Sequence, residues 1–427
     1  MEKTAVIKIW GEAVGAVAWD AERNLASFEY EPKFLRNNWD LAPFKMPIKS
    51  PRIHSFPELR DSQTFKGLPG LLADVLPDKY GNQLINTWLA QQGRPENSFN
   101  PIELLLFIGE RGMGALEFEK PILKPRKNTF VVEMDDLVSI SRKMLNQRES
   151  FATNMQKDEE KAMLDILRIG TSAGGARPKA IIAYNDKSGE IRSGQTKAPK
   201  GFEHWLIKLD GVSDEQFVAS KGYGRVEMAY HLMAKDCEIE MTDCRLQEEN
   251  GRAHFMTRRF DREGGDQKHH VQTWCAMQHY DYNEIYSFSY EQLFQTTRML
   301  KLTYLEMEQL FRRMVFNVLA RNCDDHTKNF AFILKQDSKW KLSPAYDVCH
   351  AYQPGHKWVS QQVLSVNGKR DGITNHDMME VAKSMKIKKA STIITQISEI
   401  VKNWKKYAED VKVEGKLRDE IAKTLIV

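Results

Sequence analysis

Asn322-Cys323-Asp324-Asp325-His326-Thr327-Lys328-Asn329 is the stretch that decides the fold of this chain. It places a carboxylate, Asp324, five residues before an amide, Asn329, and a second acid follows in Ser343-Pro344-Ala345-Tyr346-Asp347. Kinase-like phosphotransferases need this set, because one carboxylate receives the hydroxyl proton while an amide and a later acid hold Mg²⁺ against the ATP phosphates. The alternative is a polar loop whose Asp and Asn side chains cap backbone groups.

Two apolar segments flank this loop. Residues 303–321 predict a buried amphipathic helix, because their apolar residues recur at helical period: Leu310, Phe311, Met314, Val315, Val318 and Leu319. Residues 330–334 predict a short strand. Elements at both ends hold a loop in one geometry. Of the two acids, Asp324 has the spacing of the base, whereas Asp325 is expected to face solvent or to perturb its neighbour electrostatically.

The composition is that of an ordinary globular protein. The 427 residues are enough for two or three domains, and 41% are hydrophobic and 28% charged. A net charge of +4 does not by itself indicate nucleic acid binding. From the sequence we expect neither a membrane span nor a signal peptide. The five cysteines are scattered without a CxxC pair, which favours reduced thiols in the cytoplasm and argues against a zinc site.

The pattern along the chain indicates a small α+β domain, a linker over 121–127, and a larger part that changes from β-rich to helical. The predicted elements are a strand meander over 5–30, helices near 71–76, 84–89, 101–108, 133–146 and 158–168, a β-rich stretch over 178–260, and mostly helices after 287.

A loop of small residues precedes one apolar run: Gly170-Thr171-Ser172-Ala173-Gly174-Gly175-Ala176-Arg177-Pro178-Lys179. Small residues let backbone N–H groups approach a phosphate closely, and Lys179 can add positive charge. The spacing is not that of a Walker A motif. A plain surface turn is the alternative.

Lys208 lies inside the predicted strand His204–Asp210, an apolar setting in which a lysine is costly unless it is paired or bound to phosphate. Glu227, on a following helical pattern, is a candidate partner, as in the lysine–glutamate pair of protein kinases. The alternatives are an edge-strand lysine and a glutamate on a solvated helix face.

Arg258-Arg259-Phe260 follows a predicted strand at the place where a kinase joins its lobes and its backbone contacts adenine. A sheet edge followed by a solvated turn would give the same pattern. Near the C-terminus, Lys383, Lys386, Lys388 and Lys389 form a basic cluster that either touches DNA phosphates or is an ordinary solvated face.

Together these motifs resemble the HipA family of bacterial serine/threonine kinase toxins from type II toxin–antitoxin systems, over essentially the whole chain. In the N-terminal part the resemblance rests on Phe65-Lys66-Gly67-Leu68-Pro69, Leu76-Pro77-Asp78 and Gly112-Met113-Gly114-Ala115-Leu116. In the C-terminal part it rests on the D-x-H-x-K-N pattern of residues 324–329 and on Tyr346-Asp347.

The resemblance implies an α+β fold of the two-lobed protein-kinase-like type, related to phosphoinositide kinases, with a small N-terminal α+β subdomain and a mostly helical C-terminal lobe. The implied domains are 1–120, the N-terminal subdomain; 128–260, the rest of the N-lobe with the ATP loop and hinge; and 261–427, the helical kinase lobe. The implied activity is ATP- and Mg²⁺-dependent phosphorylation of a translation-related protein, such as an aminoacyl-tRNA synthetase. The implied partners are a small helix-turn-helix antitoxin of the HipB type and, through it, operator DNA, in the cytoplasm and away from any membrane.

The resemblance also implies residue roles. Asp324 is the catalytic base, and Asn329 and Asp347 hold the metal. Ser172 is the autophosphorylated serine, with Thr171 as the adjacent alternative. Glu227 forms an ion pair with Lys208, and Lys383 and Lys386 contact DNA. The residues implied to contact ATP are Gly174, Gly175, Ala176, Arg177, Pro178, Lys179, Lys208, Arg258, Arg259, Phe260, His326, Thr327, Lys328, Asn329, Tyr346 and Asp347.

Two positions depart from the family pattern. Arg258 stands where relatives can carry an acid, which affects what the hinge offers to adenine. Asp325 adds a negative charge where the family usually has a small or basic residue, and we expect it to tune metal affinity. Two other functions stay open: a lipid or small-molecule kinase, and a non-catalytic co-repressor that holds an antitoxin on DNA.

Overall fold

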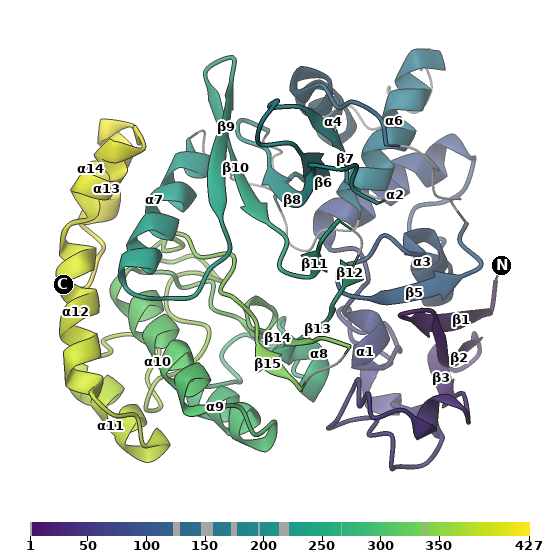
Figure 1. Cartoon of the computed structure of the whole chain (residues 1–427), viewed down its shortest axis with the longest axis horizontal. Helices are drawn as coiled ribbons and strands as arrows, with labels where there is room; N and C mark the ends of the chain where they lie inside the picture. Colours follow the sequence, from purple (N-terminus) through teal and green to yellow (C-terminus); the bar gives the residue numbers. More distant parts are fainter. Residues whose placement is uncertain are drawn as a thin grey trace. The chain divides into compact units, whose positions relative to one another are not determined.

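The computed structural model describes residues 2–122, 129–146, 157–171, 177–194, 197–212, 222–265, 267–336 and 339–427 (Figure 1). Chain contacts divide it into a first unit, Met1–Lys221 with Gln247–Val271, and a second unit, Gly222–Leu246 with Gln272–Val427. The chain thus changes unit after residues 221, 246 and 271, whereas the sequence pattern predicts one change near 260. The reason is that helix α7 (Tyr223–Asp236) packs against α12 (Ala390–Lys402) and α13 (Trp404–Asp410).

The first unit begins with a five-stranded antiparallel sheet in the order β4-β3-β2-β1-β5. Its strands are β1 (Thr4–Ile9), β2 (Glu12–Asp20), β3 (Leu25–Tyr30), β4 (Ile53–Ser55) and β5 (Leu116–Glu119), so the predicted meander is confirmed. Strand β1 alternates buried and more exposed residues, as a half-buried strand does. Gly15 must be glycine, because a Cβ atom there would lie 2.1 Å from the carbonyl oxygen of Glu29.

Short helices complete this N-terminal subdomain. They are η1 (Phe34–Arg36), η2 (Pro57–Leu59), α1 (Gly70–Ala73), α2 (Lys79–Gln91) and α3 (Pro101–Ile108). Helix α3 is buried along its whole length and packs against β1, β2 and β5. It begins at a capping box in which the Asn100 side chain accepts from the Glu103 N–H group and the Glu103 side chain accepts from the Asn100 N–H group.

A second antiparallel sheet has the order β7-β6-β8-β10-β9. Its strands are β6 (Lys179–Tyr184), β7 (Ile191–Ser193), β8 (Glu203–Lys208), β9 (Cys244–Glu249) and β10 (Arg252–Arg258). Helix α6 (Lys157–Gly170) packs on β6, and α4 (Met134–Asn146) packs on α6. The hairpin β11 (Arg262–Glu263) and β12 (Gln267–Lys268) follows β10.

The second unit is mostly helical. Besides α7, α12 and α13, its helices are α8 (Trp274–Gln278), α9 (Tyr290–Met299), α10 (Tyr304–Leu319), η3 (Thr327–Asn329), α11 (Asn375–Met385) and α14 (Gly415–Ala422). A small sheet in the order β13-β14-β15 is formed by β13 (His270–Thr273), β14 (Ala331–Leu334) and β15 (Lys341–Leu342). The α+β class, with a small α+β subdomain and a mostly helical C-terminal part, is therefore confirmed.

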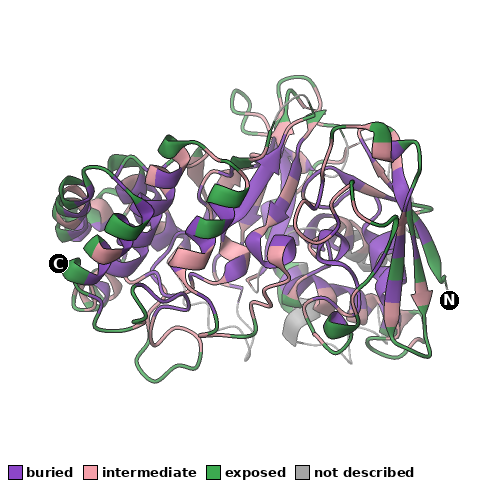
Figure 2. Ribbon diagram, turned by 90° about the horizontal axis from the view of Figure 1, so that it is seen from below, coloured by how far each residue is buried: buried purple, intermediate pink, exposed green. Residues whose placement is uncertain are grey.

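Helix α10 is the centre of the second unit. All of its residues from Leu310 to Leu319 are buried, and it begins at a capping box formed by Thr303 and Glu306. Buried residues fill the interior of each unit and the outer faces of the helices are exposed (Figure 2). The predicted helix over 303–321 and strand over 330–334 are both confirmed, so the loop between them starts and ends on buried elements. In the part of the chain that the structure describes, no helix has the length and apolarity needed to cross a bilayer.

Candidate active site

The loop after α10 is fixed to its surroundings at several points. The Asn322 side chain donates to Oδ1 of Asn317 at 2.9 Å, and the Cys323 N–H group donates to the Ala351 carbonyl at 3.1 Å. Further along, the Thr327 hydroxyl donates to the Tyr280 carbonyl at 2.9 Å. The loop therefore has one defined geometry, as an active-site loop requires.

The two acids of the loop lie in opposite environments. The side chain of Asp324 is 45% exposed, and its carboxylate lies 3.7 Å from Nε2 of His326. Asp325 is 1% exposed. The expectation that Asp325 faces solvent is therefore wrong.

The Asp325 carboxylate is buried because four donors meet it. Oδ1 accepts from the N–H groups of Val363 at 2.7 Å and Leu364 at 3.4 Å. Oδ2 accepts from the Tyr290 hydroxyl at 2.8 Å and from Nε2 of Gln362 at 3.0 Å. Burial raises the pKa of Asp325 to about 7 against the opposing effect of these four donors. Both oxygens are engaged inside the protein, which leaves Asp324 as the loop carboxylate that can meet a substrate hydroxyl.

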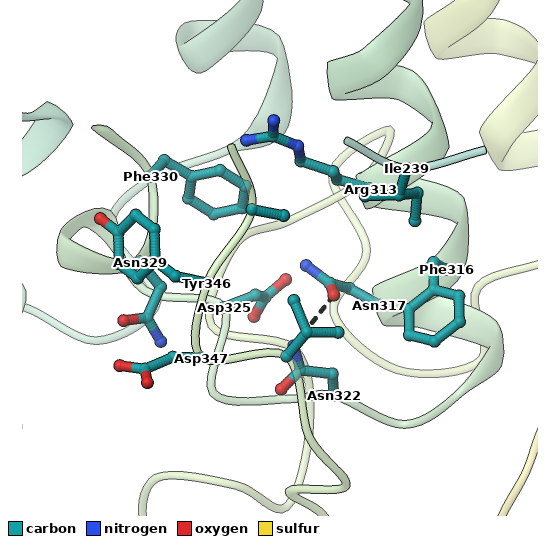
Figure 3. A pocket seen from close by; sticks show the side chains of 12 residues that line it. Ile239, Arg313, Phe316, Asn317, Asn322, Asp325, Asn329, Phe330, Tyr346 and Asp347 are labelled. Carbon is teal, nitrogen blue, oxygen red and sulfur yellow. Dashed lines mark hydrogen bonds between the residues drawn. The ribbon is translucent and has the colours of Figure 1, made fainter. Parts of the chain in front are cut away.

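Asn329 and Asp347 line one small pocket, together with Asp325 and Tyr346 (Figure 3). Nδ2 of Asn329 donates to the Asp324 carbonyl at 2.7 Å, so its Oδ1 is the atom that can face a cation. Asp347 has a left-handed backbone with φ of 52°, a conformation that aspartate adopts more readily than most residues with a Cβ atom.

Two side chains fix the segment that carries Asp347. The Tyr346 hydroxyl donates to the Lys328 carbonyl at 2.7 Å, and so joins this segment to the loop of residues 322–329. Arg313 of α10 donates through Nη2 to the Ser343 carbonyl at 2.6 Å. Burial lowers the pKa of Arg313 to about 10, so this guanidinium is still charged at neutral pH. A buried positive charge thus lies in the lining of the pocket that holds the acid.

The donor set fits Mg²⁺ better than a transition metal. Within the described ranges, no three His, Cys, Asp or Glu side chains gather into a metal-binding group. The pocket offers an amide oxygen from Asn329 and a carboxylate from Asp347. Mg²⁺ takes oxygen ligands and usually binds through one or two protein groups together with waters and substrate phosphates. The pocket is large enough for an ion or a water molecule, at about 20 Å³, and too small for a nucleotide.

His326 and Lys328 share an aromatic neighbour. The rings of His326 and Tyr282 have centroids 5.3 Å apart, and Nζ of Lys328 lies 5.1 Å from the centre of the Tyr282 ring. A cation over an aromatic face is attracted by the ring quadrupole. Tyr282 therefore helps to orient two of the expected ATP-contacting residues.

The first unit brings two lysines together. Lys179 of β6 and Lys208 of β8 are directly opposite each other in the antiparallel register. Lys179 is 3% exposed, and Nζ of Lys208 lies 5.7 Å from the centre of the Phe255 ring. Like charges directly opposite on neighbouring strands are unfavourable unless negative charge balances them. Both were expected to contact phosphate, and that contact stays a prediction.

The rest of the expected phosphate loop is described only in part. Ser172, Gly174, Gly175 and Ala176 lie outside the described residues. The backbone carbonyl of Pro178 accepts from Leu209 at 2.9 Å, and Arg177 is half-buried. Thr171 is buried, and its hydroxyl donates to the Leu167 carbonyl at 2.6 Å. This engaged hydroxyl makes Thr171 a poorer phosphate acceptor than an open serine.

The expected hinge is bound to its own unit through its arginines. Arg258 pairs with Glu203 at 3.2 Å on the surface. Arg259 is buried, and it donates through Nε and Nη2 to Asp261 at 2.9 and 2.6 Å. The Arg259 N–H group donates to the His204 carbonyl at 2.9 Å. Phe260, which follows, is half-buried, and the contact of this segment with adenine stays a prediction.

Three further predicted residues have described surroundings. Glu227 on α7 is buried, which excludes the solvated helix face. Because Glu227 belongs to the second unit and Lys208 to the first, their ion pair stays a prediction. Lys383 lies in the last turn of α11 and Lys386 caps it, and both are exposed, as either a DNA contact or a solvated face requires.

Comparison with known proteins assigns the chain. Residues 5–119 match the family model for the HipA N-terminal domain, and residues 171–404 match that for the HipA-like C-terminal domain. This chain belongs to the HipA family. Among solved structures, Shewanella oneidensis MR-1 HipA in complex with HipB and operator DNA is similar, with a TM-score of 0.66 and 15% identity over 99% of this chain and 96% of that one.

A second solved structure, the Helicobacter pylori proinflammatory kinase CtkA, matches 58% of this chain and 94% of its own at 12% identity and a TM-score of 0.34, too low for comparison of the folds. The comparison with curated proteins gives no match. The HipA assignment accounts for the kinase-like, two-lobed fold expected from the sequence.

Sequence reasoning missed four residues around this loop: Tyr282, Tyr290, Arg313 and Gln362. Tyr290 and Gln362 contact Asp325 from 35 residues before it and 37 residues after it. Arg313 reads in the sequence as part of an amphipathic helix, where an arginine is expected on the solvated side. The one hint in the sequence is its place within the apolar run, because it interrupts the residues from Leu310 to Leu319 that α10 buries.

Proposed function

We propose that this chain is an ATP- and Mg²⁺-dependent serine/threonine protein kinase that acts as the toxin of a type II toxin–antitoxin module. The observation that carries the proposal is the arrangement around one loop: a half-exposed Asp324 carboxylate, with Asn329 and Asp347 in a single small pocket. Membership of the HipA family supports it.

The proposed reaction is transfer of the γ-phosphoryl group to a hydroxyl. The hydroxyl oxygen forms a bond to the γ-phosphorus, the bond from that phosphorus to the bridging oxygen breaks, and ADP leaves. Asp324 accepts the hydroxyl proton or orients the hydroxyl. Bound Mg²⁺ would supply charge neutralisation at the phosphates. Asn329 and Asp347 would hold it through oxygen atoms, and Lys179 and Lys208 would bind phosphate oxygens.

The proposed partners follow from the family and its solved member. Shewanella oneidensis HipA was solved with HipB and operator DNA. We infer that this chain binds a HipB-like helix-turn-helix antitoxin and, through it, DNA, with Lys383 and Lys386 on the exposed basic cluster. The protein substrate would be a translation-related protein, such as an aminoacyl-tRNA synthetase, and the five free cysteines suit a reducing cytoplasm.

We further propose that the kinase phosphorylates itself on Ser172. A phosphate adds about −1.5 to −2 charge, which would compete with ATP for Lys179 and the loop N–H groups. Phosphorylation would then switch the enzyme off. The engaged hydroxyl of Thr171 supports the choice of Ser172 over its neighbour.

Labelled ATP tests the proposed function. The full chain is incubated with γ-labelled ATP, with and without Mg²⁺, alone and with a lysate of bacteria lacking this gene, and products are separated into protein, lipid and small-molecule fractions. We expect Mg²⁺-dependent label on protein serine or threonine, located by mass spectrometry. Label in the lipid or small-molecule fraction would establish the alternative kinases, and absence of transfer in every fraction would leave the co-repressor function.

A further inference from the structure

The structure assigns Asp325 a positioning role: it fastens the catalytic loop to the 362–364 segment and to α9, and so holds the Asp324 carboxylate in place for phosphoryl transfer. This inference rests on the proposed function. Asp325 itself does not touch substrate, because both of its oxygens accept hydrogen bonds from within the protein.

The contacts of Asp325 differ from those of a capping residue. A capping aspartate binds N–H groups within a few residues of itself. The partners of Asp325 are 35, 37, 38 and 39 residues away along the chain. A single carboxylate therefore ties three separate segments together: the catalytic loop, the start of α9, and the 362–364 segment.

Gln362 forms hydrogen bonds with three residues of the loop. Besides Asp325, its Nε2 donates to the Asn322 carbonyl at 3.3 Å. Its Oε1 accepts from the Cys323 thiol at 2.8 Å. The 362–364 segment thus holds the loop on both sides of Asp324, whose own carboxylate stays half-exposed.

Tyr290 closes the network on the other side. Its hydroxyl donates to Asp325 and accepts from Nδ2 of Asn317 at 3.0 Å, and Asn317 in turn accepts from Asn322 at 2.9 Å. The dashed contact between Asn317 and Asn322 is drawn in Figure 3. The ring of contacts runs from α10 through α9 back to the loop, so the geometry of the loop depends on the central helix of the second unit.

The consequence for catalysis follows from the distance between the two acids. Successive Cα atoms are about 3.8 Å apart, so freedom gained at Asp325 passes directly to Asp324. A misplacement of about 1 Å at a reacting group can cost roughly 100-fold in rate. We therefore expect Asp325→Ala to lower kcat roughly 100-fold. The KM for ATP should rise by a smaller factor, because Lys179 and Lys208, the proposed phosphate-binding lysines, lie outside this loop.

A matched control comes from a second buried aspartate in the same unit. Asp377 is also 1% exposed, and its carboxylate accepts from Thr374, Asn367 and Lys369. Those contacts join the start of α11 to the 367–369 turn. Asp377→Ala should lower Tm, as Asp325→Ala does, without lowering kcat of the folded fraction.

The experiment measures kcat, the KM for ATP and Tm for the wild type, Asp325→Ala, Asp325→Asn and Asp377→Ala as full-length chains. Asp325→Asn keeps the shape and one acceptor oxygen, so it should retain a larger kcat than Asp325→Ala. If Asp325→Ala does not fold, Tyr290→Phe removes one donor only, and it should give a smaller loss of kcat. A kcat equal to wild type in the folded Asp325→Ala variant, or in Tyr290→Phe where that variant replaces it, would overturn the positioning role.

Hydrogen exchange separates this inference from the proposed function. Asp325→Ala, or Tyr290→Phe in its place, should accelerate amide exchange over 322–330 and 362–366, whereas Asp377→Ala should not. If the wild type transfers no phosphate but the loop of the variant exchanges faster as expected, the proposed function fails and the role of Asp325 in fastening the loop stands. If the wild type is active and the exchange of the variant is unchanged, only the role of Asp325 is overturned.

Discussion

Asp261→Asn should destabilise the first unit strongly. The Asp261 carboxylate is fully buried and accepts from Arg259 at 2.6 and 2.9 Å, from Arg262 at 2.6 Å and from the Gly114 N–H group at 2.7 Å. Burial alone would raise its pKa, but the charges of Arg259 and Arg262 outweigh burial and bring the pKa well below its ordinary value. The carboxylate is therefore ionised in the folded protein throughout the neutral range.

The magnitude follows from what the substitution leaves behind. Asparagine has the same shape, but it removes the buried negative charge that Arg259 and Arg262 both bind. Removing one partner of a buried pair costs about 3–5 kcal/mol. In a domain of about 150–250 residues, 1 kcal/mol shifts Tm by about 2–4 °C, so the expected decrease is roughly 6–20 °C. The Gly112–Gly114 loop, which both arginines also bind, should loosen with it.

The assay is urea and thermal unfolding of the full chain, followed by tryptophan fluorescence. Glu203→Gln is the control, because it removes the partially exposed ion pair with Arg258, where the loss is about 0–1 kcal/mol. A loss for Asp261→Asn no larger than for Glu203→Gln would refute the reasoning, since the buried cluster would then contribute no more than a surface pair.

The other predictions concern nucleotide, self-modification, DNA and pH. Lys208→Ala should weaken Mg-ATP affinity and rate together in a calorimetric titration, and unchanged binding would make it an edge-strand lysine. Protein isolated in active form should carry phosphate on Ser172 by mass spectrometry and recover ATP binding after phosphatase, and phosphate elsewhere would contradict the switch. Replacing Lys383 and Lys386 with Ala should make DNA binding by the antitoxin complex less dependent on salt: the slope of log K against log salt concentration should fall by about one for each phosphate that the complex no longer neutralises. An unaltered slope would make the cluster a solvated face. Burial lowers to about 4 the pKa of His204, His231, His270 and His350. Between pH about 6.5 and 4 these histidines therefore bind more protons in the unfolded chain than in the folded one, so the urea midpoint should fall as the pH is lowered. A urea midpoint that does not change with pH would contradict this.

The parts of the fold that the sequence predicts are those in which neighbours along the chain determine the structure. The helical period of 303–321 and the apolar run of 330–334 predict α10 and β14. Of the three residues singled out by spacing, Asn329 and Asp347 line one pocket, and the loop acid in that lining is Asp325 instead of Asp324. In each case a local pattern of apolar side chains requires one element, and the polar loop must lie between the elements.

The parts that could not be predicted depend on contacts between distant residues. Asp325 looks like a surface acid in sequence, and it is buried because donors from Tyr290 and the 362–364 segment meet it. Arg313 is buried on α10 because the Ser343 carbonyl receives it. The change of unit before α7 likewise follows from packing against α12 and α13, which are more than 150 residues away. No local periodicity carries such information.

The central claim is that the loop of Asp324 and the segment of Asp347 form a phosphoryl-transfer site. The most direct test measures the initial rate of γ-phosphate transfer by the wild type, Asp324→Asn and Asp347→Asn under saturating Mg-ATP. Loss of a general base typically costs about 10²–10⁴-fold, and we expect at least that from Asp324→Asn with an unchanged unfolding midpoint, because its side chain is half-exposed. Asp347→Asn should lose transfer as well, with part of the rate restored by excess Mg²⁺. Transfer at the wild-type rate by folded Asp324→Asn would contradict the account.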